Sequence, residues 1–247
     1  MTAVVDHYAT HLGPVYAWMA GGIPAAIERG AGEIGSLDLH PDSGAIAVDL
    51  GAGFGMHAIP LARLGYAVIA IDSCAELLDE LRAGTGQLPI QLVADDLLSF
   101  RRHLHAAPRL ILCMGDTLTH LESTDAVAKL IAAAAAALPV DGRFIVTFRD
   151  YSQALTGERR FIPVRSDDRR ILTCFLEYSD AHVTVHDLLH EHADAGWQLR
   201  VSSYRKLRLA PAWVVSALES AGFAVRSEPG LSGMVRLAAR RLAPVSN

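Results

Sequence analysis

Residues 46–55, Ile-Ala-Val-Asp-Leu-Gly-Ala-Gly-Phe-Gly, decide the fold of this chain. An apolar run contains Asp49 near its end, and Gly51, Gly53 and Gly55 follow at alternate positions. A buried strand that runs into a glycine-rich turn and then a helix has this pattern, because glycine allows left-handed backbone and close approach to a ligand. This stretch therefore predicts a strand, a tight turn and a ligand site.

Apolar segments and helical segments alternate on the C-terminal side of this stretch. We expect strands at 45–50, 67–71, 90–94, 109–114 and 143–148, helices at 55–64, 74–83 and 123–138, and a short helical piece at 96–104. Short apolar strands that alternate with helices predict an α/β fold with a parallel sheet covered on both faces.

The pattern changes after residue 150. Three β-rich segments, at 169–178, 182–192 and 197–208, are joined by short turns and predict an antiparallel meander. A helix at 211–221 and strands at about 223–228 and 233–240 close the chain. We expect a single domain over residues 1–247, made of a helical cap (1–44), a cofactor-binding core (45–150), a β-rich lid insertion (151–209) and a closing helix with two strands (210–247).

The composition excludes several kinds of partner. The net charge is −5, which favours neither a nucleic acid nor an anionic membrane surface. The sequence has no apolar run of membrane-spanning length and no secretory signal, and its three cysteines are widely spaced. We therefore expect a cytoplasmic protein with no nucleic-acid or membrane partner.

Acidic residues stand at the ends of the next predicted strands, where a parallel sheet binds its ligands. Asp72, followed by Ser73, lies 17 residues after Gly55, the place where an acid binds both ribose hydroxyls. Asp95 and Asp96 end the third strand and can meet the amine of an adenine, and Met114 ends the fourth strand. Together these residues predict a pocket for an adenosine, although each acid can instead cap the helix that follows it.

The spacing of the turn distinguishes between two adenosine cofactors. A dinucleotide site usually reads G-x-G-x-x-G, whereas this turn reads G-x-G-x-G and Asp49 precedes it by two residues. A carboxylate at that place repels a pyrophosphate but can orient an ammonium group. The turn therefore favours S-adenosylmethionine over NAD.

The stretch Val48–Gly55 resembles the first signature of the class I S-adenosylmethionine-dependent methyltransferases. Asp72, Asp95 and the segment 113–116 are similar to the strand ends that follow it in this family. The resemblance implies a Rossmann-like, mostly parallel sheet of seven strands with an antiparallel last strand. The N-terminal segment and the β insertion are similar to those of small-molecule methyltransferases of the glycine N-methyltransferase-like group.

The resemblance implies methyl transfer from S-adenosylmethionine to an oxygen or a nitrogen of a small molecule. Two alternatives stay open at this point: an NAD(P)-dependent oxidoreductase, and a cofactor-binding partner or sensor protein without activity. The sequence does not identify the acceptor.

Residues expected at the reacting end of the pocket come from the loops and from the N-terminal segment. Because a histidine exchanges protons near neutral pH, His120 is the first catalytic candidate, followed by His11 and Asp116. Aromatic faces attract a sulfonium cation, and Tyr16 is the preferred cofactor contact of this kind. The candidate substrate contacts are Tyr8, Trp18, Arg149 and Tyr204. Packing of the aromatic side chains in a core is the alternative.

The segment 182–192 places four histidines, at 182, 186, 190 and 192, on one face of a strand. Their spacing matches no zinc signature, so we expect no metal site. The meander offers an exposed edge for pairing between subunits, which predicts a homodimer.

Overall fold

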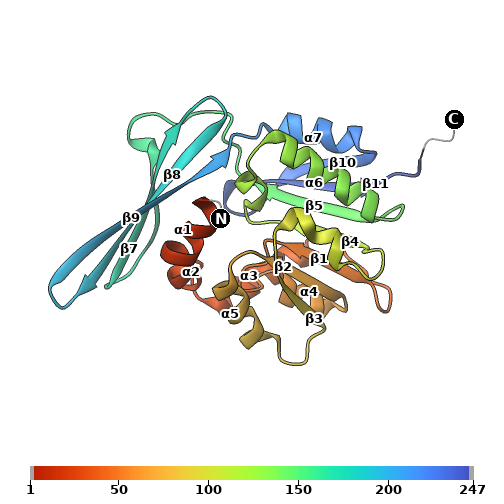
Figure 1. Cartoon of the computed structure of the whole chain (residues 1–247), viewed down its shortest axis with the longest axis horizontal. Helices are drawn as coiled ribbons and strands as arrows, with labels where there is room; N and C mark the ends of the chain where they lie inside the picture. Colours follow the sequence, from red (N-terminus) through yellow and green to blue (C-terminus); the bar gives the residue numbers. More distant parts are fainter. Residues whose placement is uncertain (1–2, 245–247) are drawn as a thin grey trace.

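The computed structural model describes residues 3–244 and contains two β-sheets (Figure 1). The strands of the larger sheet are β1 (Ile46–Leu50), β2 (Ala67–Asp72), β3 (Ile90–Ala94), β4 (Leu110–Cys113), β5 (Arg143–Phe148), β10 (Phe223–Pro229) and β11 (Val235–Arg241). Their order across the sheet is β10-β11-β5-β4-β1-β2-β3. The strands β1 to β5 pair in parallel, whereas β11 is antiparallel to both of its neighbours. The predicted fold class is confirmed.

Helices cover both faces of this sheet. On one face lie α3 (Ile23–Gly35), α4 (Ala58–Leu64) and α5 (Ala75–Thr85), and on the other lie α6 (Thr124–Ala137) and α7 (Pro211–Ser220). The alternation of strand side chains produces two cores: Ile46, Val48 and Leu50 of β1 pack with α6 and α7, while Ala47 packs with α3 and α4. The carboxyl ends of β1 to β5 remain free to carry a site.

The second sheet stands beside the first one, and the N-terminal helices lie between the two sheets (Figure 1). Its strands are β6 (Phe161–Ser166), β7 (Arg170–Tyr178), β8 (His182–Ala193) and β9 (Gly196–Leu207), and all neighbouring pairs are antiparallel. The sequence predicted three of these strands and missed β6. All six residues of β6 are exposed and Pro163 interrupts it, so it shows no alternation of buried and exposed positions.

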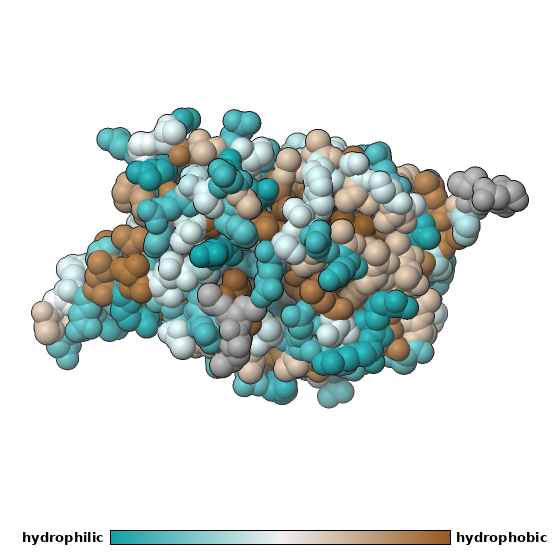
Figure 2. Space-filling model, turned by 45° about the horizontal axis from the view of Figure 1, so that its top comes forward, coloured by the Kyte–Doolittle hydropathy of each residue, from teal (hydrophilic) through white to brown (hydrophobic). Residues whose placement is uncertain are grey.

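The two faces of this second sheet differ as the histidine spacing predicts. Val183, Val185, Asp187 and Leu189 of β8 are buried, whereas the histidines of the strand lie on the more exposed face. Exposed apolar side chains belong to the same sheet: Phe161, Ile162, Val164, Ile171, Trp197, Leu199 and Val201. Figure 2 shows apolar surface gathered on this part of the molecule.

The N-terminal segment consists of α1 (Ala3–His7), a π-helical turn η1 (Tyr8–Leu12) and α2 (Gly13–Met19). Leu12 and Val15 of this segment pack on Leu172 and Leu189 of the second sheet. Within residues 3–244, no helix combines the length and the apolar character required to cross a membrane.

Candidate active site

A cavity of about 670 Å³ lies at the carboxyl ends of the parallel strands. The glycine turn after β1, the ends of β2, β3 and β4, and the N-terminal segment form its walls. Among the residues predicted to bind the cofactor, those that line the cavity are Tyr16, Gly51, Gly53, Asp72, Ser73, Asp95, Asp96 and Met114. These eight residues are a minority of the cavity lining.

The glycine turn requires glycine at each of its three positions. Gly51, Gly53 and Gly55 all have positive φ, at 75°, 52° and 93°. A Cβ on Gly51 would lie 2.5 Å from Thr117, and one on Gly55 would lie 2.3 Å from Leu81. Gly51 and Gly53 face the cavity, whereas Gly55 lies outside its lining and allows α5 to pack closely.

Asp72 joins the glycine turn to the start of α5. Its carboxylate accepts the backbone N–H groups of Gly53 (2.7 Å) and Cys74 (2.8 Å). Burial raises the pKa of Asp72, and these two hydrogen bonds oppose the rise. Each carboxylate oxygen keeps a second lone pair, so the side chain can also accept the hydroxyls of a ribose.

The two acids after β3 have different partners. Oδ2 of Asp95 pairs with Arg102 and His103, both at 2.5 Å, and the hydrogen bond from His103 lowers the pKa of Asp95. Asp96 accepts the N–H of Leu98 at 2.7 Å and caps the 3-10 helix η2 (Leu97–His103). Asp96 therefore caps the following helix, as the alternative reading of the sequence allowed, and both Asp95 and Asp96 line the cavity.

Asp49 lies below the glycine turn and is only 1% exposed. Burial raises its pKa to about 6, while nearby His57 acts in the opposite direction. The residue lies outside the lining of the cavity, and its Oδ2 has no hydrogen-bond partner within residues 3–244. An unpartnered buried carboxylate oxygen at this place suits an ammonium group and not a pyrophosphate.

Aromatic rings form a row from the glycine turn to the second sheet. Phe54, Tyr16, Tyr8 and His120 follow one another with ring centroids 5.7 Å apart at each step, and all four line the cavity. Tyr204 of β9 stacks on His120 at 5.5 Å from outside the lining. The row therefore connects the cofactor side of the cavity with the second sheet.

His120 is held in its neutral form. Burial, helped by the charge of nearby Lys206, lowers its pKa to about 3, whereas Asp116 opposes the shift. Its Nδ1 is buried and has no partner among the residues that the structure describes. The imidazole is thus a neutral group that can orient an acceptor and is a weak base.

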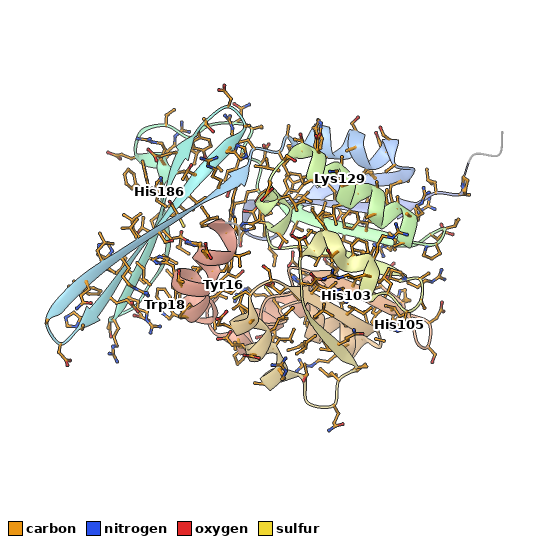
Figure 3. The ribbon with its side chains drawn as sticks, in the orientation of Figure 1. Tyr16, Trp18, His103, His105, Lys129 and His186 are labelled. Atoms are coloured by element: carbon orange, nitrogen blue, oxygen red, sulfur yellow. The ribbon has the colours of Figure 1, made fainter. Side chains whose placement is uncertain are left out.

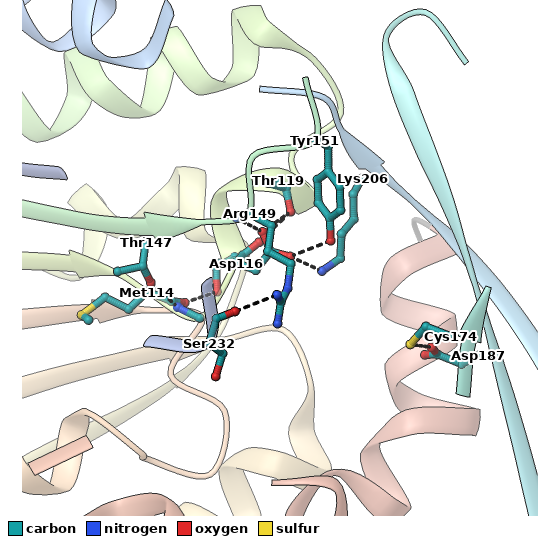
Figure 4. A network of polar contacts seen from close by, with 12 residues as sticks. Met114, Asp116, Thr119, Thr147, Arg149, Tyr151, Cys174, Asp187, Lys206 and Ser232 are labelled. Atoms are coloured by element: carbon teal, nitrogen blue, oxygen red, sulfur yellow. Dashed lines mark hydrogen bonds and ion pairs between the residues drawn. The ribbon is translucent and has the colours of Figure 1, made fainter. Parts of the chain in front are cut away.

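Asp116 is the centre of a buried polar network (Figure 4). Oδ2 contacts Nζ of Lys206 (2.5 Å) and the hydroxyl of Tyr151 (3.3 Å), while Oδ1 accepts the N–H of Arg149 (2.9 Å) and the hydroxyl of Thr119 (3.0 Å). Burial would raise its pKa, but Lys206 and the hydrogen bonds hold the pKa below its ordinary value. Asp116, a catalytic candidate from the sequence, lies outside the cavity lining with both carboxylate oxygens engaged, and its role stays a prediction.

Other predicted residues also lie outside the cavity lining. His11 is buried beside His7, with ring centroids 5.3 Å apart. Trp18 donates its Nε1–H to Asp167 in the turn between β6 and β7 (2.5 Å), and Figure 3 shows Trp18 on the side of the second sheet while Tyr16 lies nearer the larger one. Arg149 donates to the carbonyl of Ser232 at 3.0 Å.

The sequence analysis missed Thr117, Lys206 and His7. Thr117 lines the cavity and follows directly after Asp116. Lys206 shares the parity of Tyr204 on β9, and this alternation was the available signal for it. His7 precedes His11 by one helical turn, and it pairs with Asp187 at 2.9 Å.

Comparison with known proteins agrees with this geometry. Residues 47–142 match the model of a methyltransferase domain family. These residues carry the glycine turn and the three strand ends that form the cavity. This stretch, which is less than half of the chain, is similar to the methyltransferase domain of that family. S-adenosylmethionine is the cofactor of this family, so the alternative of an NAD(P)-dependent oxidoreductase is not supported.

Three known proteins show what this chain is similar to. The glycine/sarcosine N-methyltransferase of Aphanothece halophytica is 28% identical over 110 residues, which span 44% of this chain and 42% of that enzyme. The CcbJ methyltransferase of Streptomyces caelestis is 21% identical with a TM-score of 0.76, over 96% of this chain and 98% of the other. CalS10, an amino pentose methyltransferase of Micromonospora echinaspora, is 17% identical with a TM-score of 0.73, over 87% and 91% of the two chains. At these identities the two structures establish the fold.

Proposed function

We propose that this methyltransferase transfers the methyl group of S-adenosylmethionine to an amine nitrogen of a small molecule. The names of two relatives support an amine acceptor, since one is a glycine/sarcosine N-methyltransferase and the other an amino pentose methyltransferase. The observation that carries the proposal is the neutral imidazole of His120 beside Tyr8 in the wall of the cavity.

The cofactor, when bound, supplies a methyl group on a sulfonium centre for in-line displacement. Asp72 would hold the ribose, the segment from Asp95 to Leu97 would meet the adenine, and the glycine turn with Tyr16 would enclose the amino-acid end, since all of them line the cavity. The aromatic rings of Tyr8 and Tyr16 both line the cavity and attract a cation in it. These residues align the reactants and exclude water, which is the main work of such an enzyme.

The weak basicity of His120 favours an amine over an alcohol. An alcohol must lose its proton while it attacks, and a general base works best with a pKa near the working pH. Burial lowers the pKa of His120 to about 3, so its neutral ring accepts a hydrogen bond but takes up a proton poorly. An amine can lose its proton to water before it enters the cavity and then needs orientation only.

A matched panel of acceptors tests this proposal. The purified chain is incubated with S-adenosylmethionine and pairs of acceptors that differ only by an amino group in place of a hydroxyl group, and S-adenosylhomocysteine and the methylated product are measured. Turnover with the amines and not with the alcohols is expected. Methylation of the hydroxyl members instead would overturn the choice of nitrogen. Cofactor binding without turnover of any acceptor would favour the partner or sensor alternative.

Two further expectations from the sequence stay predictions: the single-domain organisation and the homodimer. The exposed apolar side chains of the second sheet, among them Trp197, Leu199 and Val201, are the surface on which a second copy would pack. Sedimentation of the purified chain measures the oligomeric state.

A further inference from the structure

A polar row crosses the buried face of the second sheet. The strand register places Cys174 of β7 and Ser202 of β9 directly opposite Asp187 of β8, so these three side chains share one face. The adjacent row on that face consists of Leu176, Val185 and Tyr204. A carboxylate among such neighbours is costly unless it has polar partners, so the partners of Asp187 need an account.

His7 of α1 is the main partner of this row. Its Nε2 lies 2.9 Å from Oδ2 of Asp187, and its Nδ1 lies 2.8 Å from Oγ of Ser202. Oδ1 of Asp187 accepts the Sγ–H of Cys174 at 2.8 Å (Figure 4). Burial would raise the pKa of Asp187, but the hydrogen bonds from His7 and Cys174 hold it below its ordinary value. The side chains of His7 and Asp187 are 0% and 2% exposed, so a buried, directional bridge joins α1 to two strands.

The rotation of α1 is separate from that of α2. The π-helical turn Tyr8–Leu12 joins the two helices, and the N–H of Gly13 donates to the carbonyl of Tyr8, five residues earlier. A Cβ on Gly13 would lie 2.5 Å from that carbonyl oxygen, so this turn requires glycine there. A π-helical turn interrupts the regular helical period. The packing of Leu12 and Val15 on the second sheet therefore does not by itself fix the face that α1 presents.

The rotation of α1 decides what stands at the acceptor end of the cavity, where Tyr8 and His120 lie 5.7 Å apart. Successive helical residues project about 100° apart, so the hydrogen bonds of His7 toward the second sheet also set the direction of Tyr8. The ring of His7 lies 4.3 Å from that of Tyr204, which stacks on His120. His7 therefore supports the acceptor end of the cavity through both of its aromatic neighbours.

Apolar contacts alone would hold α1 without defining its rotation. Val4 of α1 packs on the apolar cluster of the second sheet that contains Val185 and Tyr204. Such packing is non-directional, and an apolar pair of similar volume in place of a buried polar pair is often equally stable or more stable. The hydrogen-bonded bridge therefore points to a role beyond stability.

We propose that His7, Asp187 and Ser202 are positioning residues for methyl transfer. Their hydrogen bonds fix the rotation of α1, which places Tyr8 at the acceptor end of the cavity. All three residues lie outside the cavity lining, so they act through Tyr8 and not by contact with a ligand. The inference rests on the proposed function and adds residues of the second sheet to the same site.

A double variant separates positioning from stability. His7→Leu with Asp187→Val replaces the polar pair by apolar side chains of similar size. Its Tm should exceed that of His7→Leu alone, which leaves the carboxylate of Asp187 buried without its histidine. Tyr16 and Phe54, at the cofactor end, belong to α2 and the glycine turn, so calorimetry should give a dissociation constant for S-adenosylhomocysteine within about threefold of that of the natural chain.

The kinetic readout uses the amine of the acceptor panel that the natural chain methylates fastest, with glycine and D-glucosamine among the amines tried. For this amine, kcat/KM of the apolar double variant should fall by about tenfold to a hundredfold, because misplacement of a positioning group by about 1 Å has an effect of this size. The matched control is the double variant His186→Leu with Glu177→Val. It removes a pair with a 2.6 Å contact from the opposite face of the same sheet and should keep kcat/KM within about twofold.

A conservative variant completes the test. The amide of His7→Gln can donate to Asp187 and accept from Ser202, so its kcat/KM should exceed that of His7→Leu, and equal values would overturn the inference even if the double variant did not fold. Natural kcat/KM in the folded apolar double variant, or an equal loss of affinity for S-adenosylhomocysteine, would also overturn it. A natural chain that methylates no member of the panel would overturn the proposed function instead.

Discussion

Removal of the Lys206 charge should destabilise the protein through Asp116. The change Lys206→Met preserves the length of an aliphatic side chain but leaves the carboxylate of Asp116 buried without its cationic partner. The side chains of the pair are 10% and 6% exposed, so water cannot replace the lost partner. Breaking a buried ion pair by removing one member costs about 3–5 kcal/mol.

This cost can be measured as a shift in thermal unfolding. For a chain of 247 residues, about 2–4 °C of Tm corresponds to each kcal/mol, so Lys206→Met should lower Tm by roughly 6–20 °C at pH 7. Adding Asp116→Asn removes the orphaned charge and keeps an oxygen for the N–H of Arg149. The double variant should therefore recover at least half of the loss. The control, Lys129→Met at an exposed lysine, should change stability by no more than about 0.5 kcal/mol.

The pH dependence of this loss has a definite sign. The pKa of Asp116 is lower in the folded chain than in the unfolded one, so its contribution to stability is present above the unfolded pKa and disappears as the pH falls through the folded pKa. The difference in Tm between the natural chain and Lys206→Met should therefore shrink in acid. A difference below 2 °C at neutral pH, or a double variant no more stable than Lys206→Met, would refute the reasoning.

The remaining predictions concern the cofactor and the pH profile. Asp72→Ala should weaken binding of S-adenosylhomocysteine by at least about tenfold in calorimetry, since it removes the ribose acceptor and the support of the glycine turn; unchanged affinity would contradict this role. Because burial raises the pKa of Asp49 to about 6, its charge costs stability that grows as the pH rises above the unfolded pKa and is fully present above the folded pKa. Asp49→Asn should therefore increase stability at pH 7 by up to about 3 kcal/mol in denaturant unfolding while it weakens cofactor binding; lower stability would refute the assignment. Since Lys206 lowers the pKa of His120, Lys206→Met should move the acid limb of the pH–rate profile to higher pH. An unchanged acid limb would show that the charge of Lys206 does not act on the rate through His120.

Local patterns were sufficient for the large sheet and for several residues of the cavity wall. The glycines at 51, 53 and 55 and the acid at 72 are adjacent to strand ends, so alternation along the chain located them. The strand β6 was missed because its six residues are all exposed and show no period. Contacts between residues that lie far apart in the sequence left no pattern from which they could be predicted. Asp116 and Lys206 are 90 residues apart, and Glu33 meets His57 only because Gly30 allows a helix and a loop to touch.

The sequence also did not show in which direction each aromatic side chain of the N-terminal segment points. Tyr8, Tyr16 and Trp18 stand close together in the sequence, yet the first two line the cavity and Trp18 contacts Asp167 in the turn between β6 and β7. Tyr16 and Trp18 are two residues apart on α2, so a regular α-helix turns their side chains about 200° away from each other. Tyr16 therefore lines the cavity whereas Trp18 does not, and the role of each stays a prediction.

The central claim is that the loops at the carboxyl ends of β1 to β4 hold S-adenosylmethionine. Calorimetric titration of the purified chain with S-adenosylmethionine and with S-adenosylhomocysteine tests it most directly, with Asp72→Ala as the control. We predict one binding site per chain for each ligand and a marked loss of affinity in the variant. A folded chain that releases no heat with either ligand, or a variant that binds them as tightly as the natural chain, would contradict the account.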